Sequence, residues 1–340
     1  MPAFDIIAIG AAVQDIFIQS KEWETRKDAN APDGIDALIP IGAKLSIDEP
    51  VIASGGGATN ASVTFARFGL KAACFARVGD DVPGHAILEE LRREGISTKG
   101  IEVVKKERTG LSIILLASTG QRGILSHRGV SASINPNVFP WHQRYSLISP
   151  FKTKWIYLTS LGGDKLALKK IFAHAKAHGI KIAWNPGKKE LAQGWKSLMP
   201  HLKQTDILIM NREEAAELTN KAPRHLDQIL DSFSGMPSLI IVTTDGGQGA
   251  YVRKAGKTLF SSNIQAKRVN TTGAGDAFGS AFVASFIQGH SLETAMAAAT
   301  LNATGVITNM GAKEGILHAF PNEKQLKKVK IRIYKGQNKR

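Results

Sequence analysis

Short apolar runs that alternate with helical segments are the feature that most constrains the fold. In the second half of the chain, residues 155–158 and 180–184 are apolar runs of strand length, and residues 166–178 between them have the pattern of a helix. Short apolar runs of this kind form strands buried on both faces of a sheet. Further runs lie at residues 6–10, 72–78, 206–210 and 239–243. Strands alternating with helices predict an α/β fold with a doubly wound, mostly parallel sheet flanked by helices.

The length and charge of the chain bound its organisation and its partners. The 340 residues suit one large domain, which we expect at residues 1–325, followed by a basic segment at 326–340 that is either a solvated tail or an edge strand. The net charge of +15 would attract nucleic acids, anionic membranes or anionic small molecules. A nucleic-acid binder would need a basic stripe interleaved with aromatic residues, and only 7% of the residues are aromatic. We therefore expect a small-molecule substrate.

Cysteine and histidine content argue against several kinds of site. The single cysteine, Cys74, lies in an apolar run, so neither a disulfide framework nor a cysteine metal site is possible. His174 and His178 stand four apart on a predicted helix, and we interpret them as surface residues. The N-terminus has no signal-peptide pattern, and no run reaches the length of a membrane span. We expect a cytoplasmic enzyme with no membrane partner.

A glycine-rich turn at residues 269–278 feeds directly into a helix. Gly273 and Gly275 stand at its start, and each glycine costs up to about 1 kcal/mol relative to alanine inside a helix. That cost is explained if an anion approaches the unpaired N–H groups of the helix N-terminus. Asp276 could face the same anion, which indicates a phosphate beside a base. The alternative is a plain helix start with Thr272 as N-cap.

A second glycine-rich turn, at residues 54–60, also leads into a helix. Gly55 and Gly56 would permit close approach by a ligand, and Asn60 offers both a donor and an acceptor, as a sugar hydroxyl requires. Asp15 lies near the carboxyl end of the first predicted strand, where ligands of open α/β sheets bind. A plain strand-to-helix turn, and a turn role for Asp15, are the alternatives. No Walker P-loop occurs in the chain.

Polar residues follow the strands of the second half. Asn185 ends one strand, and Asn211 with Glu214 begins the helix after the next, either as a capping box or as a metal and phosphate contact. The loop at residues 244–249 is either a hairpin or a cover over a nucleotide.

Together, the two glycine elements resemble those of the ribokinase-like (PfkB) family of carbohydrate and nucleoside kinases. The early match is Gly55-Gly56 with Asn60, continuing through residues 66–69 and 78–81, and the late match is residues 272–278. The strand-end residues fall where that family places its nucleotide-side motifs. The resemblance covers about residues 5–320.

This resemblance implies a small β lid over the substrate. Its strands would come from residues 14–19, 37–47 and 111–128, with the first two paired to each other. It also implies transfer of the ATP γ-phosphoryl group to a hydroxyl, with Mg²⁺ as cofactor. We favour a small sugar as acceptor, with an adenosine-type nucleoside as the alternative.

The matched positions imply a role for each candidate residue. Asp276 would be the catalytic base, beside an anion hole formed by the backbone N–H groups of Gly273, Ala274 and Gly275. The substrate would be held by Asp15, Gly55, Gly56 and Asn60. The nucleotide phosphates and Mg²⁺ would be served by Asn185, Asn211 and Glu214, with Glu214 at the metal. The nucleotide site would be lined by Thr244, Gly246, Gly249 and Asn302.

One departure from the family pattern concerns monovalent cations. The family usually has Asp where this chain has Asn270, in a loop that borders a monovalent-cation site with residues 311 and 312. We expect K⁺ activation to be weak or absent because one negative charge is missing. A second expectation is that the helix dipole keeps Asp276 ionised.

Two further points bear on function. A catalytically inactive homologue is the competing class, and the intact Gly-Ala-Gly-Asp sequence at 273–276 argues against it.

A homodimer would be favoured if the lid sheet had an apolar outer face, which depends on the direction of Ile16 and Ile18.

Overall fold

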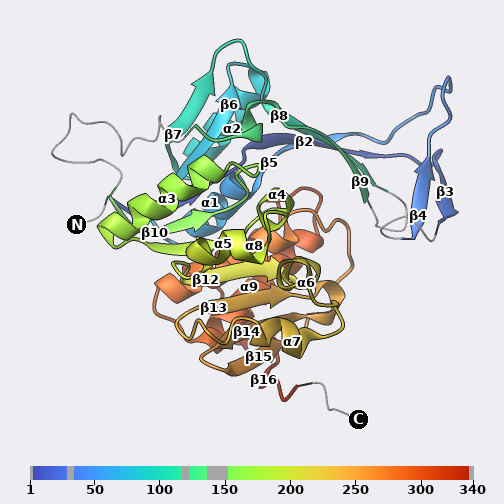
Figure 1. Cartoon of the computed structure of the whole chain (residues 1–340). Coiled ribbons are helices and arrows are strands. Elements are labelled where there is room, and N and C mark those ends of the chain that lie inside the picture. Colours follow the sequence, from blue (N-terminus) through green and yellow to red (C-terminus); the bar gives the residue numbers. More distant parts are fainter. Residues whose placement is uncertain (1–2, 29–33, 117–121, 136–151, 337–340) are drawn as a thin grey trace.

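A ten-stranded sheet forms the centre of the computed structural model, which describes the chain except residues 1–2, 29–33, 117–121, 136–151 and 337–340 (Figure 1). The strand order is β16-β15-β14-β13-β12-β11-β10-β1-β6-β7, parallel from β13 to β7 and antiparallel from β13 to β16. The strands are β1 (Phe4–Ile9), β6 (Ala72–Gly79), β7 (Ser97–Val104), β10 (Thr153–Leu158), β11 (Lys181–Trp184), β12 (Ile207–Asn211), β13 (Ile240–Thr244), β14 (Ala250–Lys254), β15 (Lys257–Ser261) and β16 (Ile331–Ile333).

Both faces of this sheet are covered by helices. In β1, Ile6 and Ala8 point into one apolar core and Ile7 and Ile9 into the other, since successive side chains of a strand face opposite ways. The first core is closed by α1 (Gly57–Arg67), α2 (Val82–Arg93), α8 (Ala274–Ile287), α9 (Leu292–Ile307) and α10 (Glu323–Leu326). The second is closed by α3 (Lys165–His178), α4 (Lys188–Leu191), α5 (Gly194–Leu202), α6 (Arg212–Thr219) and α7 (Leu226–Asp231). The doubly wound, mostly parallel fold is confirmed.

A smaller sheet extends away from the body as a lid (Figure 1). Its order is β5 (Val51–Gly55), β2 (Val13–Gln19), β8 (Gly110–Leu116) and β9 (Arg122–His127). Strand β2 runs parallel to β8 and antiparallel to β5, with Asp15 opposite Ala53 and Ser112. Phe17, Ile114 and Leu116 pack on one face of this sheet against Met310 of the body.

The predicted pairing of residues 14–19 with residues 37–47 was wrong. Strand β2 pairs with β5 and β8, whereas β4 (Ile35–Leu38) forms a separate hairpin with β3 (Glu24–Lys27). The next residues cannot continue a strand, because Pro40 has no N–H for a ladder and Gly42 turns the chain at φ 88°. Residues 51–55, which lead directly into α1, take their place.

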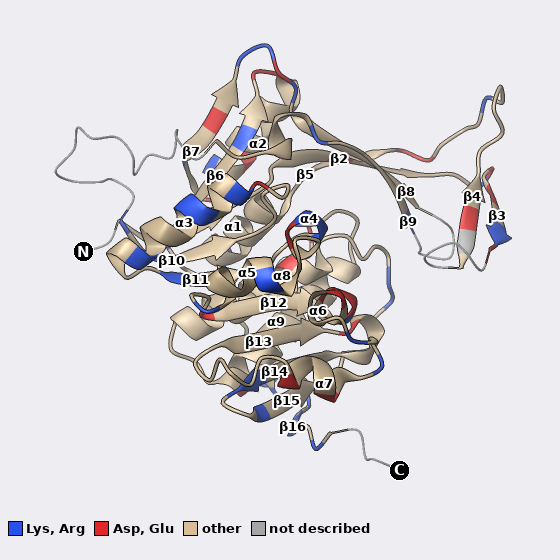
Figure 2. Cartoon of the chain, in the orientation of Figure 1, with Lys and Arg blue, Asp and Glu red and all other residues tan. Residues whose placement is uncertain are grey.

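The basic C-terminal segment contributes a strand to the edge of the large sheet. Of the two interpretations, a solvated tail or an edge strand, the structure has the strand: residues 331–333 pair antiparallel with β15. The Arg332 guanidinium lies 5.0 Å from the Phe260 ring centroid. Elsewhere, Lys and Arg are distributed over many elements and interspersed with Asp and Glu (Figure 2). Among the described residues, no helix has the length and apolarity that a bilayer crossing requires.

Candidate active site

A polar cavity of about 230 Å³ lies where the carboxyl ends of three parallel strands meet the N-terminus of α8. Ligands of open α/β sheets bind at such strand ends. Asn185 follows β11, Asn211 ends β12 and Thr244 ends β13. The cavity is lined by Arg122, Asn185, Ile209, Met210, Asn211, Glu214, Thr244, Thr271, Gly273, Gly275 and Asp276.

The start of α8 leaves backbone N–H groups facing this cavity. Gly273 is the N-cap, in the left-handed region at φ 80°, and no side chain caps the helix. The alternative of a Thr272 cap was therefore wrong. A Cβ on Gly273 would lie 2.7 Å from the Cβ of Ala312, whereas a Cβ on Gly275 would meet no atom within 4 Å. Ala274 N–H contacts Thr271 O at 3.3 Å, and Gly275 borders open space within reach of an anion.

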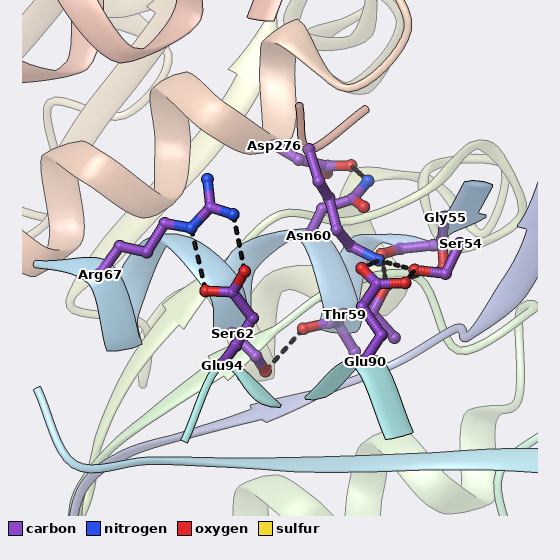
Figure 3. A network of polar contacts seen from close by, with 12 residues as sticks. Ser54, Gly55, Thr59, Asn60, Ser62, Arg67, Glu90, Glu94 and Asp276 are labelled. Carbon is purple, nitrogen blue, oxygen red and sulfur yellow. Dashed lines mark hydrogen bonds and ion pairs between the residues drawn. The ribbon is translucent and has the colours of Figure 1, made fainter. Parts of the chain in front are cut away.

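Asp276 lies in the first turn of α8 and joins the two glycine elements. Its Oδ2 accepts a hydrogen bond of 2.8 Å from Asn60 Nδ2, across 216 positions of sequence (Figure 3). Asn60 is 3% exposed, and its Oδ1 has no hydrogen-bond partner among the described residues. A buried acceptor of this kind needs a partner, which a substrate hydroxyl would supply.

Burial is the largest influence on the pKa of Asp276. Burial raises the pKa of this carboxyl above its ordinary value, and the Asn60 hydrogen bond and the Lys313 charge lower it only in part. This direction is opposite to the one expected from the helix dipole. A raised pKa makes the carboxylate a better proton acceptor near neutral pH.

Asp15 stands on the lid side of the site, pressed against the early glycines. A Cβ on Gly55 would lie 2.0 Å from Asp15 Oδ2, and a Cβ on Gly56, at φ 97°, would lie 2.4 Å from Ala11 O. These glycines are thus required by the packing of the chain itself. Asp15 is 4% exposed; burial raises its pKa, while the Ser112 hydrogen bond and the Lys313 charge lower it.

Asn211 and Glu214 form the capping box that their spacing predicted. Asn211 Oδ1 accepts from Glu214 N at 2.8 Å, and Glu214 Oε2 accepts from Asn211 N at 2.8 Å. Both residues also line the cavity, so the cap and a ligand contact are compatible. Burial raises the pKa of Glu214. Nearby, Asn185 Nδ2 donates to Ile209 O at 2.9 Å, which fixes the side chain at the cavity wall.

Glu214 and Asp276 are carboxylates that a divalent cation could use. Mg²⁺ is usually held by one or two carboxylates together with substrate phosphates and water. The cavity supplies both groups, with donors for phosphate on the same wall. The residues present therefore fit a Mg²⁺-nucleotide complex.

Three predicted nucleotide-site residues do not line the cavity. Gly246 begins an exposed 3₁₀ turn, η3 (Gly246–Gln248), and Gly249 packs against Ser261 O, which a Cβ would approach to 2.2 Å. Asn302 is fully buried: its Nδ2 donates to Ala277 O at 2.9 Å and its Oδ1 accepts from Leu317 N at 2.9 Å. Asn302 therefore holds elements together, because both ends of its amide are already paired.

Two cationic side chains near the site, Arg122 and Lys313, were not predicted from the sequence. Arg122 of β9 donates to Thr271 Oγ1 and lines the cavity from the lid side. Lys313 is 6% exposed and contacts Glu90 and Ser54, the residue that precedes Gly55. Neither lies in a local motif; only the long-range fold brings them to the site.

Comparison with known proteins finds a family match over most of the chain. The model of the pfkB family of carbohydrate kinases matches residues 42–319. A ribokinase from Haemophilus influenzae is 27% identical over 271 residues, which cover 78% of this chain and 84% of the relative.

Two solved structures show the same fold. Ribokinase from Arabidopsis thaliana, complexed with ribose and ATP, superposes with a TM-score of 0.73 at 21% identity, over 96% of this chain and 98% of the other. A nucleoside kinase from Burkholderia thailandensis, in complex with inosine, gives 0.71 at 16% identity, over 94% and 96%. Sugar and nucleoside kinases thus share this architecture.

Proposed function

Because the chain belongs to the PfkB family of carbohydrate kinases, whose members are phosphotransferases, we propose that it transfers the γ-phosphoryl group of ATP to a hydroxyl of a small sugar. The observation that carries this proposal is the 2.8 Å contact of Asn60 with Asp276 beside the open N-terminus of α8. It joins Asn60, which would bind the hydroxyl, to Asp276, which would be the base and lines the cavity together with Gly273 and Gly275.

The acceptor would be held on the lid side by Asp15, Asn60 and the backbone at Gly55 and Gly56. Its reacting hydroxyl would lie against Asp276. As the hydroxyl oxygen bonds to the γ-phosphorus, the bond from that phosphorus to the β–γ bridging oxygen breaks, the proton passes to Asp276 Oδ, and ADP leaves. Positioning and charge stabilisation dominate such a transfer.

Charge on the transferred group would be stabilised by the α8 N-terminus at Gly273 and Gly275 and by Arg122. The predicted third donor, Ala274 N–H, is already bonded to Thr271 O. Asn185, Asn211 and Thr244 would contact the nucleotide phosphates, and Glu214 would hold Mg²⁺, whose chemistry is to neutralise phosphate charge. The loop from Gly246 to Gly249 would cover the nucleoside part of ATP.

A sugar is favoured over a nucleoside because the aromatic side chain of β2 is buried and cannot stack on a nucleobase. Phe17 is 2% exposed and packs against Ile114 and Met310, so its ring is not available to stack on a base. Ile41 is fully exposed in the segment after β4, outside the cavity lining. Among the described residues that line the cavity, none is aromatic.

The test is an ATP-consumption screen over sugars and nucleosides, with wild type and Asp276→Ala side by side. We expect turnover with one or more sugars that disappears in the variant. Turnover with nucleosides alone would replace the sugar by the nucleoside alternative. Retained consumption of ATP by the Asp276→Ala variant would contradict the proposed active site.

We also propose weak or absent K⁺ activation. Asn270 is 1% exposed; its Oδ1 accepts from Thr272 N at 2.9 Å, and its Nδ2 has no partner among the described residues. An amide donor thus stands where the family resemblance leads us to expect a carboxylate, and a donor repels a cation.

A homodimer through the lid is supported by an aliphatic row on its outer face. Ile52, Ile16, Ile113 and Leu125 stand side by side across all four strands, opposite in direction to buried Phe17. Ile52 is 61% and Leu125 60% exposed. A row of this kind on a single chain marks a protein contact.

Sedimentation tests this dimer. We expect wild type at twice the chain mass of 36.6 kDa and Ile52→Lys at the chain mass. Ile333→Lys, which alters an aliphatic side chain 58% exposed on the other sheet, is the control. A monomeric wild type would contradict the proposal.

A further inference from the structure

Strand β9 forms an open edge of the lid and is exposed along its whole length. It lies antiparallel to β8, with Ile124 opposite Ile114 and Ser126 opposite Ser112. Residues directly opposite each other in such a pair point to the same face of the sheet. Ile114 packs toward the body in the apolar cluster of the lid, so Ile124 and, two residues further on, Ser126 face the body as well.

One row of polar side chains crosses this body-facing side of the lid. Asp15 of β2 lies opposite Ser112 of β8, which in turn lies opposite Ser126 of β9. The Ser112 hydroxyl donates to the Asp15 carboxylate. Ser126 is exposed, and its hydroxyl has no hydrogen-bond partner within the described parts of the chain. Because neighbouring strands lie about 4.8 Å apart, the row runs for roughly 10 Å from Asp15 to Ser126.

Packing of the lid does not account for the two serines. Two residues away on the same three strands, the corresponding row consists of apolar side chains, those of Phe17, Ile114 and Ile124. Strands favour β-branched and aromatic residues, and serine is neither. The hydroxyls themselves are then the feature to explain.

The row lies at the end of β9 that is remote from the phosphoryl-transfer cavity. Arg122, at the start of β9, lines that cavity together with Asp276. Ser126 lies four positions further along, which is about 14 Å of extended strand. An acceptor whose reacting hydroxyl lies against Asp276 would therefore extend under β9, past Ile124, toward the row.

We propose, on the basis of the proposed function, that Ser112 and Ser126 are specificity-determining residues, which together with Asp15 bind hydroxyls at the end of the acceptor remote from the reacting one. The Asp15 carboxylate accepts hydrogen bonds, and a serine hydroxyl both donates and accepts. Three polar side chains in one row fit a free sugar with three neighbouring hydroxyls. A nucleoside fits less well, because its base replaces one of these hydroxyls.

The experiment compares wild type with Ser112→Ala and Ser126→Ala over free pentoses and hexoses, their monodeoxy analogues and nucleosides. With the parent sugar of highest turnover, we expect each variant to lose about fivefold in kcat/KM, which corresponds to one hydrogen bond. The loss should lie in KM for the sugar and leave KM for ATP unchanged. With the analogue that lacks the hydroxyl bound by Ser126, Ser126→Ala and wild type should be equal.

Two further variants separate recognition from structure. Ser126→Thr keeps a hydroxyl on the strand and should keep the preference among the analogues. Ser197→Ala removes an exposed serine of α5 and is the matched control, which should leave every kcat/KM unchanged. A purely structural role of Ser126 would lower kcat/KM by the same factor for every analogue.

Calorimetric titration with the same sugars in the absence of ATP gives a readout without turnover. Weaker sugar binding by Ser126→Ala supports the proposal even if no phosphate is transferred, an outcome that would count against the proposed function alone. Unchanged binding and kcat/KM in Ser126→Ala, an equal loss for every analogue, or binding of nucleosides in place of free sugars would overturn it. Absence of binding by every sugar would do the same.

Discussion

The two glycine-rich turns differ in what their glycines face. In the early turn, Gly55 and Gly56 are pressed against Asp15 and the backbone of Ala11. In the late turn, Gly273 is pressed against Ala312, but Gly275 faces open space. Similar sequence patterns thus arise from different needs, and Gly275 is the one of these four that internal packing leaves unexplained.

The largest expected effect belongs to the late turn. We expect Asp276→Asn to reduce kcat by at least about two orders of magnitude, because the amide cannot take the acceptor proton. Steady-state kinetics at saturating ATP measure it, with thermal melting as the folding check. Asp164→Asn, at the N-cap of α3, is the matched control, since asparagine caps equally well. Near-normal turnover in a folded Asp276→Asn protein would remove Asp276 as the base.

A pair of alanine substitutions separates packing from ligand approach. Gly275→Ala should keep or raise stability, by up to about 1 kcal/mol, yet lower kcat by about tenfold or more, because a methyl group enters the anion site. Gly56→Ala should lose about 1–3 kcal/mol of stability, because φ 97° strains an alanine. Chemical denaturation and kinetics measure both. A fully active Gly275→Ala protein would contradict the interpretation that Gly275 leaves room for an anion.

Substitution of Arg122 tests whether a cation from the lid takes part in the anion site at the late turn. Removing the cation in Arg122→Met should lower kcat/KM for ATP by roughly tenfold, because a charge-assisted contact to phosphate is lost. Arg128→Met alters an arginine just beyond the same strand that does not line the cavity. Equal losses in the two variants would indicate a general effect of lid charge.

The smallest expected effect concerns K⁺ at Asn270, the second residue of the late turn. Replacing K⁺ by tetramethylammonium should leave turnover nearly unchanged, whereas Asn270→Asp should make turnover depend on K⁺, because a carboxylate attracts the cation. Activity measured in matched ionic strength compares them. A large loss of wild-type rate without K⁺ would contradict the proposal.

Local chemistry made much of the fold and site predictable. The turn into α8, the capping box of Asn211 and Glu214 and the apolar run of β1 all depend on neighbours in sequence. The lid pairing depends on which distant strand meets β2, and β7, with its mixed residues at the sheet edge, has no apolar run to reveal it. Lys313 reaches Glu90 across more than two hundred positions, so no local pattern could indicate it.

The alternation of side chains along β2 also limits which insertions and deletions the sequence can tolerate. Its odd-numbered residues, Asp15 and Phe17, face the site and the body, while Ile16 and Ile18 occupy the opposite face. Because side chains alternate with a period of two, inserting or deleting one residue ahead of Asp15 would turn the whole strand over. The carboxylate would then point outward and an isoleucine into the acceptor site. Length change here should be far less tolerated than in the exposed segment from Ile39 to Ile47, although both lie within the same lid region of the sequence.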